Sequence, residues 1–377
     1  MGLFGKKESR SPGLIGVDVG AGGIKAVELI PESGKVRLAT YGYSQIKNFD
    51  TWTGSLLDDP KKGAEILLRI HKESGMKSMR ANASLPSQHV FHAIITIPQP
   101  KDAKENLKPM IEAQVRKLLP QPIENMILDS LVIDKQLLPK PIVEDKKAQA
   151  LALPPPPQES KHIRVLVSGA PKELVGKYLE IFKLAKIELV SLETEAFALI
   201  RSLIGNDKAR VMIVDIGYER TNITIVYEGI PYLHRSIKTG GGVITSMLAK
   251  QTGVTMAEAE QMKVDLASAT NADVPQVLKD AMMPILHEIR YSLELFGAQD
   301  FHEHNTVEKI ILTGGSARLP YIDPFLTEAL NINVYIGDPW ARIAVPAGLR
   351  PVLDEIGPRF SVAAGLAMKL LPEKKEK

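Results

Sequence analysis

Two distant stretches of the chain repeat one hydrophobic pattern. In each, an apolar run ends at an aspartate, turns through glycine and resumes as a second apolar run: LIGVDVGAGGIKAVEL at 14–29 and VMIVDIGYERTNITIVYEG at 211–229. Short apolar runs bounded by turn residues are typical of β-strands. A third such run follows each pair, so residues 13–46 are predicted to form a three-stranded meander, and the pattern restarts at residue 209. The two halves therefore show an internal duplication of pattern, although not of residue identity.

Helical periodicity fills much of the remaining chain. Residues 60–75 and the segments KELVGKYLEIFKLA, TEAFALIRSLI and VITSMLAKQTG carry apolar residues at helical spacing. The run from Thr255 to Glu258 is a capping box, so a helix is predicted to begin there. A long helical stretch follows, in which Pro284 is expected to kink or divide the helix because proline lacks a backbone N–H. Strands KIILTGG and NVYIG and a helix from about Leu319 come next.

A block of different character lies at about 80–137. It contains the predicted strands ANASLP, VFHAIITIP and MILDSLVIDKQ around the amphipathic helix KENLKPMIEAQVRKLL, which indicates a small inserted domain. Residues 139–160 lack periodicity and include four consecutive prolines, so a loop is expected there. The expected domain order is 13–46 (first lobe), 47–138 (mainly the inserted subdomain), 139–161 (proline-rich loop), 162–208 (first lobe, continued), 209–345 (second lobe, with a helical subdomain at about 250–306) and 346–371 (return to the first lobe).

Composition narrows the functional classes. The 377 residues include no cysteine, which excludes disulfides and thiolate metal sites. Charged residues make up 24% and the formal net charge is +3, a balance that gives no indication of a nucleic-acid partner. No apolar run reaches the length of roughly 18 residues that a membrane-spanning helix needs. The tryptophans, Trp52 and Trp340, are expected to be packed aromatics.

The first aspartate turn suits a phosphate site. Asp18 stands at the end of a predicted strand, where main-chain donors become free, and Gly20, Ala21, Gly22 and Gly23 follow it. Small residues let backbone N–H groups approach an anion without steric conflict. Lys25 can add a positive charge to the same phosphates.

The second aspartate turn is the counterpart of the first. Asp215 ends its strand, Gly217 follows, and Thr221 and Asn222 supply a hydroxyl and an amide. Asp18 and Asp215 together are expected to hold Mg²⁺ through water, because Mg²⁺ keeps much of its hydration shell. One such turn alone is most simply an ordinary strand–turn–strand, but two copies, each in the first hairpin of its half, favour phosphate binding.

Two further segments extend the expected site. Gly240, Gly241 and the glycine after them precede a predicted helix, where N–H groups point outward. Glu260 and Lys263 share one face of the capped helix and are candidates to reach ribose or adenine.

The last candidate segment is IILTGGSARLP at 310–320. Gly314 and Gly315 follow the end of its strand and allow the backbone to lie against a base, and Ser316 is a candidate hydrogen-bond partner for that base. The simpler interpretation of this segment alone is a strand-to-helix turn.

These five segments, in this order, resemble the actin-like ATPase superfamily. VDVGAGGIK is similar to its first phosphate loop, VDIGYERTN to its second, AEQMK to its ribose-contacting helix and LTGGSARLP to its adenosine loop. Within the superfamily, ASLPSQHVFHAIITIPQP, IEAQVRKLLPQPIENMILDSLVID and EIRYSLELF resemble the PilM family of type IV pilus assembly.

The resemblance implies an α/β fold of two RNase H-like lobes, with ATP or ADP and Mg²⁺ in the cleft and a small inserted α+β domain. It implies a cytoplasmic scaffold that binds the N-terminal cytoplasmic peptide of PilN, a single-pass membrane protein, in a groove between the insertion and the first lobe. Such a protein is peripheral at the inner membrane through its partner, with other pilus assembly proteins as further candidate partners. Chemistry in the family is weak, and ATP acts mainly as a structural and conformational ligand.

The chain departs from the superfamily pattern in its first loop, where Ala21, Gly22 and Gly23 replace the hydroxyl residues that are often found there. Main-chain N–H groups can still hold phosphates, but the loss of side-chain hydroxyls weakens the case for efficient hydrolysis. The sequence also assigns no residue to positioning the attacking water, as phosphoryl transfer requires.

Two alternative functions stay open. A small-molecule kinase on the same fold needs a general-base carboxylate facing the γ-phosphate, and no acidic residue stands in a clear turn beyond those already assigned. A membrane-associated filament protein like FtsA typically ends in an amphipathic helix, whereas this sequence ends GLAMKLLPEKKEK, interrupted by Pro372.

Overall fold

A computed structural model describes residues 13–44, 56–100, 102, 106–134, 162–268, 276–298 and 306–370. Its contacts divide the chain into two compact units. The first comprises residues 1–88 and 176–377, and the second residues 89–175. The expected proline-rich loop at 139–161 and Trp52 lie outside the described residues.

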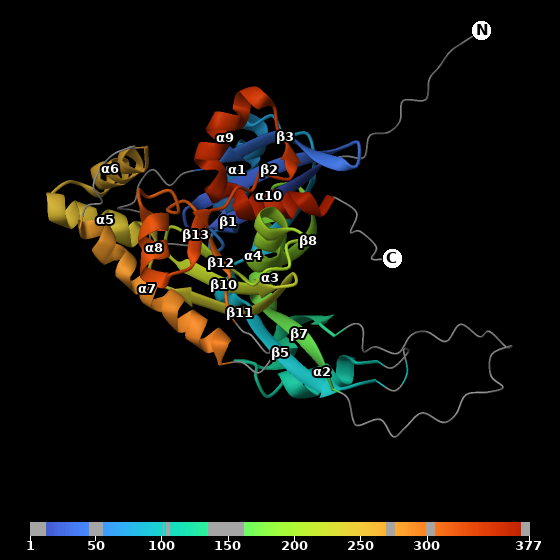
Figure 1. The fold of residues 1–377 in the computed structure, drawn as a ribbon. Coiled ribbons are helices and arrows are strands. Elements are labelled where there is room, and N and C mark those ends of the chain that lie inside the picture. Colours follow the sequence, from blue (N-terminus) through green and yellow to red (C-terminus); the bar gives the residue numbers. More distant parts are fainter. Residues whose placement is uncertain are drawn as a thin grey trace, which may run out of the picture. The chain divides into compact units, whose positions relative to one another are not determined.

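The first unit contains a six-stranded sheet with the order β14-β3-β2-β1-β4-β8 (Figure 1). Strands β1, β2 and β3 form the predicted antiparallel meander, and β4 and β8 extend it in parallel from β1. The bounds are β1 Leu14–Gly20, β2 Gly23–Glu32, β3 Lys35–Tyr43, β4 Arg80–Leu85, β8 Glu188–Thr194 and β14 Ile343–Ala344.

A second sheet of the same unit has the order β11-β10-β9-β12-β13. Its first three strands are antiparallel and its last two run parallel to β9, which repeats the plan of β3-β2-β1-β4-β8. The duplication predicted from the hydrophobic pattern is therefore present in three dimensions. The bounds are β9 Val211–Ile216, β10 Thr221–Tyr227, β11 Ile230–Ile237, β12 Lys309–Thr313 and β13 Asn333–Ile336.

The helices of the first unit lie between and after these strands in the chain (Figure 1). The predicted capping box is confirmed, since Thr255 and Glu258 exchange side-chain and backbone hydrogen bonds at the start of α6. The bounds are α1 Pro60–Glu73, α3 Lys172–Leu184, α4 Glu195–Leu199, α5 Gly241–Thr252, α6 Met256–Ser268, α7 Gln276–Gly297, α8 Ile322–Leu330, α9 Arg350–Ile356 and α10 Ser361–Ala367. The first turn of α3, up to Val175, belongs to the second unit.

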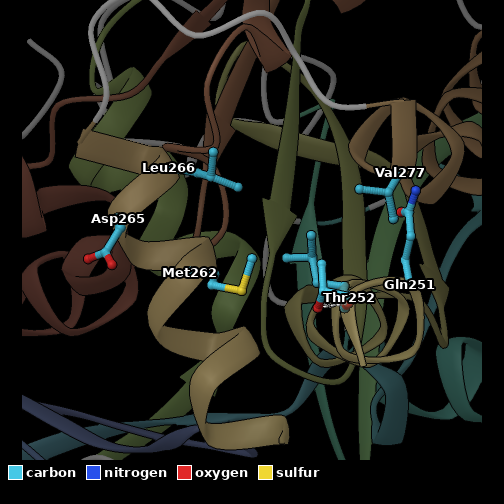
Figure 2. A pocket seen from close by; sticks show the side chains of 7 residues that line it. Gln251, Thr252, Met262, Asp265, Leu266 and Val277 are labelled. Atoms are coloured by element: carbon cyan, nitrogen blue, oxygen red, sulfur yellow. Dashed lines mark hydrogen bonds between the residues drawn. The ribbon is translucent and has the colours of Figure 1, made fainter. Parts of the chain in front are cut away.

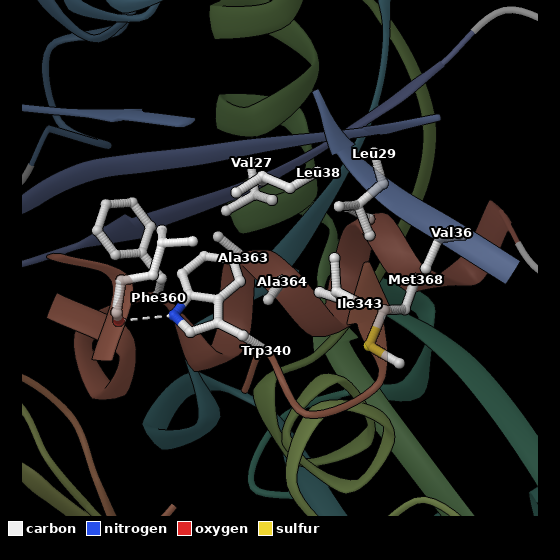
Figure 3. Packing of buried hydrophobic residues seen from close by; sticks show 12 residues of the cluster. Val27, Leu29, Val36, Leu38, Trp340, Ile343, Phe360, Ala363, Ala364 and Met368 are labelled. Atoms are coloured by element: carbon white, nitrogen blue, oxygen red, sulfur yellow. Dashed lines mark hydrogen bonds between the residues drawn. The ribbon is translucent and has the colours of Figure 1, made fainter. Parts of the chain in front are cut away.

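Both faces of the first sheet are covered. Strand β2 alternates, so that Val27 and Leu29 pack with residues of α10, whereas Ala26 pairs with Gly42, which lies against the end of α1. Trp340 sits fully buried in the core on the α10 side, and its indole N–H donates to the Leu353 carbonyl at 2.8 Å (Figure 3). The expectation that Trp340 is a packed aromatic is confirmed.

The second unit is a three-stranded antiparallel sheet, β5-β7-β6, with helix α2 packed on it. Its apolar core includes Ile97, Val115 and Val165. Asp134, beyond the end of β6, accepts hydrogen bonds from both the backbone N–H and the guanidinium of Arg164 on β7. The bounds are β5 Phe91–Pro98, α2 Lys108–Val115, β6 Met126–Val132 and β7 His162–Pro171.

The structure corrects the segment boundaries expected from sequence. The segment 47–138, expected to be mainly the inserted subdomain, also contains helix α1 and strand β4 of the first unit, and β4 pairs with β1 and β8. Strand β7 falls within 162–208, expected as first lobe, but it is the central strand of the second unit. Strand pairing determines the placement of β4 and β7.

Three local expectations also change. Helix α2 is shorter than the predicted amphipathic segment, and α8 begins at Ile322 rather than near Leu319. Of the two expected effects of Pro284, a kink or a division, only the division is excluded: α7 is continuous, because the loss of one N–H is tolerated in a helix whose apolar face is buried along its length.

Candidate functional site

The two aspartates that the sequence singled out lie at equivalent places in the duplicated sheets. Asp18 is on β1 and Asp215 on β9, each directly paired across the hairpin, to Lys25 and Asn222 respectively. Burial raises the pKa of Asp215 to about 6, the negative charge of Asp18 adds to this, and Lys25 opposes it. The structure thus brings both carboxylates into one electrostatic cluster.

Lys25 is the cation of this cluster. Its ammonium lies 3.2 Å from the Asp18 carboxylate, and both side chains are largely shielded from solvent. Because Lys25 supplies one positive charge against the two carboxylates of Asp18 and Asp215, the cluster keeps an excess of negative charge.

The two aspartate turns face each other. A Cβ placed on Gly22 in the first turn would lie 3.3 Å from the Cβ of Tyr218 in the second. Gly23 has a φ of +120°, which requires glycine, and Gly20 and Ala21 complete the turn. The first turn therefore lies against Tyr218 of the second turn.

Thr221 and Asn222 have more defined partners than the sequence indicated. Thr221 is buried, and its hydroxyl donates to the Thr239 carbonyl at 2.6 Å, which closes the second turn. The Asn222 amide donates to Glu195 at 3.3 Å and accepts from Ser236 at 2.7 Å. Both residues therefore stabilise the second turn through hydrogen bonds within the protein.

Glu195 is the residue that the sequence analysis missed. It begins α4, directly after β8, and lies at the carboxyl end of the parallel strands next to β1. Burial raises the pKa of Glu195 to about 8, and the charges of Asp18 and Asp215 contribute, against hydrogen bonds from Ser87. The sequence feature that could have indicated Glu195 is its position in SLETE, where a strand passes into a helix. Ligand-binding groups gather beyond the carboxyl ends of parallel strands.

The glycine run before α5 is bound to the second turn. The N–H groups of Gly241 and Gly242 donate to the carbonyls of Gly217 and Tyr218, each at 2.8 Å. These two donors are therefore used within the protein and are not directed at an anion. These hydrogen bonds attach the second turn, at Gly217, to the start of α5, which follows Gly240.

Lys263 also has internal partners. Its ammonium is buried and donates to the Gly241 carbonyl at 3.1 Å, the Thr245 hydroxyl at 2.8 Å and Glu260 at 2.6 Å. Burial lowers the pKa of Lys263, and the charge of Glu260 opposes this. Lys263 of α6 is thus hydrogen-bonded to two residues of α5. Glu260 is partly exposed.

The loop after β12 lies next to Asp215 and to the start of α5. A Cβ on Gly314, whose φ is +89°, would lie 2.5 Å from the Asp215 carboxylate. Ser316 is buried next to Gly241, and its backbone N–H donates to Ile216 at 3.2 Å. Gly315 has open space where a side chain would stand. The first turn and the loop after β12 therefore meet the second turn at Asp215, and α5 and α6 join it through Gly217 and Gly241.

A separate apolar pocket of about 510 Å³ lies between α5, α6 and α7. Met262 and Leu266 line one side, and Gln251, Thr252 and Val277 line the other (Figure 2). Its lining includes none of the residues predicted for nucleotide binding, so it is distinct from the carboxylate cluster.

Comparison with known proteins identifies the family. The sequence model of the type IV pilus assembly protein PilM matches residues 149–371. The chain belongs to the PilM family. Among solved structures, a PilM–PilN type IV pilus biogenesis complex is similar over 95% of this chain and 98% of that chain, with 24% identity and a TM-score of 0.76.

Two further structures place the PilM-family chain in the actin-like ATPase fold. The ethanolamine utilization protein EutJ from Carboxydothermus hydrogenoformans has 16% identity and a TM-score of 0.52, covering 95% of this chain and 89% of that chain. MreB5 of Spiroplasma citri, bound to ADP, has 14% identity and a TM-score of 0.50, covering 94% and 95%. The expected fold class is confirmed.

In the described part of this PilM-family chain, no helix combines the length and apolarity needed to cross a membrane.

Proposed function

We propose that the chain binds ATP or ADP with Mg²⁺ between its two aspartate turns and acts as a nucleotide-dependent scaffold of the type IV pilus machine. The observation that carries the proposal is the cluster of Asp18, Asp215 and Glu195, in which negative charge exceeds that of Lys25. A hydrated divalent cation suits such a cluster, because it neutralises carboxylates without needing a closed ligand cage.

The other converging segments are assigned by their geometry. The turn of Gly20, Ala21, Gly22 and Gly23 presents N–H groups to the phosphates, as in other anion-binding turns, and Lys25 adds its charge. Gly314, Gly315 and Ser316 are assigned to border the base, since Gly315 has open space beside it. Glu260, with its partial exposure, is the ribose candidate, and Lys263 supports it.

The proposed chemistry is slow hydrolysis at most. Bound Mg²⁺ would supply charge neutralisation for the phosphates. Glu195 is our candidate to orient a water and accept its proton, because one of its oxygens lacks a hydrogen-bond partner among the described residues. The first turn offers no side-chain hydroxyl, so stabilisation of developing charge depends on main-chain donors and the cation.

The partner proposal rests on the family. Family membership and similarity to a PilM–PilN complex support binding of the cytoplasmic N-terminal peptide of a PilN-like inner-membrane protein. Binding of this kind makes the chain a peripheral inner-membrane component. We assign part of the contact to the 80–137 block, where Leu118 and Ile127 expose large apolar side chains.

Nucleotide binding is tested by calorimetric titration of the full chain with MgATP. Asp18→Ala and Asp215→Ala are expected to lower the affinity at least tenfold and to leave the circular dichroism spectrum unchanged. Asp280→Ala, on the exposed face of α7, is the matched control and should bind as wild type does. Wild-type affinity in both cleft variants would contradict the assignment.

The partner is tested by fluorescence anisotropy with a labelled peptide that copies the cytoplasmic N-terminus of the PilN-like protein. The double variant Leu118→Ser, Ile127→Ser should weaken binding about tenfold. Leu349→Ser, Val352→Ser removes comparable exposed apolar groups from the first unit and should have little effect. Equal binding by both double variants would exclude the surface around Leu118 and Ile127.

A further inference from the structure

Ser87 makes two hydrogen bonds to Glu195. Its backbone N–H donates to Glu195 Oε2 at 3.2 Å, and its hydroxyl donates to the same oxygen at 2.8 Å. Ser87 is 2% exposed, so water does not compete effectively for these bonds. Asn222 from β10 adds a third donor to Oε2 at 3.3 Å.

This arrangement treats the two carboxylate oxygens differently. Three donors converge on Oε2, while Oε1 has no hydrogen-bond partner within the described ranges. Because a carboxylate is planar, fixing Oε2 from several directions also fixes where Oε1 points. Glu195 keeps partial exposure, and Oε1 is its oxygen without a hydrogen-bond partner within the described ranges.

The Asn222 donor is itself held in place. The Ser236 hydroxyl donates to Asn222 Oδ1 at 2.7 Å, and the Arg220 guanidinium donates to Ser236 at 2.9 Å. The amide of Asn222 is thereby oriented with its NH₂ toward Glu195. The second turn and Ser87 consequently hold the same carboxylate from two sides.

Ser87 lies at the chain boundary between the first and second units. Strand β4 ends at Leu85, the 3₁₀ turn Ser87–His89 follows, and the second unit begins at residue 89. Only Gln88 separates Ser87 from that unit. Ser87 and the first residue of the second unit therefore share one short 3₁₀ turn, Ser87–His89.

We propose that Ser87 is a positioning residue for Glu195 and that it couples the nucleotide cleft to the second unit. The inference rests on the proposed nucleotide binding. Nucleotide that engages Glu195 alters the bonds to Ser87 and hence the start of β5, and a partner that reorders the second unit alters Glu195 in return. Thermodynamic linkage requires the two effects to be equal in free energy.

The test measures hydrogen exchange of the full chain with and without MgATP. In wild type, MgATP should change deuterium uptake in residues 89–98. Ser87→Ala, which removes the hydroxyl donor, should lose more than half of that change while binding MgATP within about threefold of wild type. Ser87→Thr restores a hydroxyl and should recover the change. Ser87→Cys keeps the volume with a weak donor and should resemble the alanine variant.

Ser84→Ala is the matched control. Ser84 is a buried hydroxyl on β4, the strand that precedes the turn of Ser87, and it has no hydrogen-bond partner among the described residues, so its removal should leave the exchange response intact. A full response in both Ser87→Ala and Ser87→Cys would overturn the proposal, as would a wild type that binds MgATP and shows no change in residues 89–98. Failure of wild type to bind MgATP in the parallel titration would instead contradict the proposed function.

Discussion

Gly365 of α10 and Ala198 of α4 touch through their backbones. A Cβ on Gly365 would lie 1.9 Å from the Ala198 carbonyl oxygen, which is far inside any permitted contact. Helix α4 begins at Glu195, and α10 packs on the sheet that contains Asp18. The close contact therefore fixes the helix that presents Glu195 relative to the strand that presents Asp18.

Gly365→Ala should destabilise the protein because the new methyl group has no space. The expected loss is about 3 kcal/mol or more, measured as a fall in the thermal unfolding midpoint. Gly176→Ala in α3 is the matched control, since no atom lies within 4 Å of the position that its new methyl group would take. That control should be neutral or stabilising by roughly 0.5–1 kcal/mol, because alanine restricts the unfolded chain. A stable Gly365→Ala variant would show that α4 and α10 do not meet in this way.

Glu195 makes the stability of the ligand-free protein depend on pH. Its pKa is raised from 4.5 to about 8, so the folded state holds a proton that the unfolded state releases. This contribution is fully present below about pH 4.5 and is lost as pH rises through about 8. Glu195→Gln removes the ionisation and should raise the unfolding free energy at pH 8 by on the order of 1–3 kcal/mol, with a smaller gain at pH 5.

The control for this prediction is the neighbouring acid two residues earlier. Glu193 forms ion pairs with Arg201 and Lys369, so Glu193→Gln should destabilise the protein where Glu195→Gln stabilises it. Urea unfolding of both variants at pH 5 and pH 8 gives the comparison. Equal effects of Glu195→Gln at the two pH values would argue against a buried carboxylate with a raised pKa.

Two ion pairs in the second unit differ mainly in burial. Asp134 pairs with Arg164 in a shielded position, whereas Arg116 and Glu124 pair with 57% and 65% of their side chains exposed. Asp134→Ala should cost roughly 3–5 kcal/mol, because it removes the shielded carboxylate that accepts from both the guanidinium and the backbone N–H of Arg164. Glu124→Ala should leave the unfolding midpoint almost unchanged, since solvent replaces an exposed partner. Similar losses in both would mean that burial of the Asp134 pair is not what stabilises the unit.

The sequence was sufficient for the local elements and the duplication. Apolar alternation and glycine turns predicted the meanders that carry Asp18 and Asp215, because a hairpin is determined by neighbouring residues. Placement of β7 was missed, because its partners β5 and β6 are joined to it by long-range pairing that no local pattern encodes.

For the candidate site residues too, local sequence indicates some features and long-range contacts determine others. A turn that needs glycine can be predicted from residue type, and Gly23 and Gly314 do have positive φ angles. Thr221 and Lys263 were given ligand contacts from their chemistry, whereas the structure satisfies them internally. Glu195 was missed because an acid at a strand–helix junction has no special spacing, and only the sheet order brings it to Asp18.

The central claim is that a nucleotide and its cation lie between the two aspartate turns. A crystal structure of the full chain with AMPPNP and Mn²⁺ in place of Mg²⁺ tests it most directly, because Mn²⁺ has an anomalous signal that locates the cation. We predict one strong anomalous peak within reach of both Asp18 and Asp215, with the phosphates along Gly20–Gly23. A peak elsewhere, or nucleotide density in the pocket lined by Met262 and Leu266, would contradict the account.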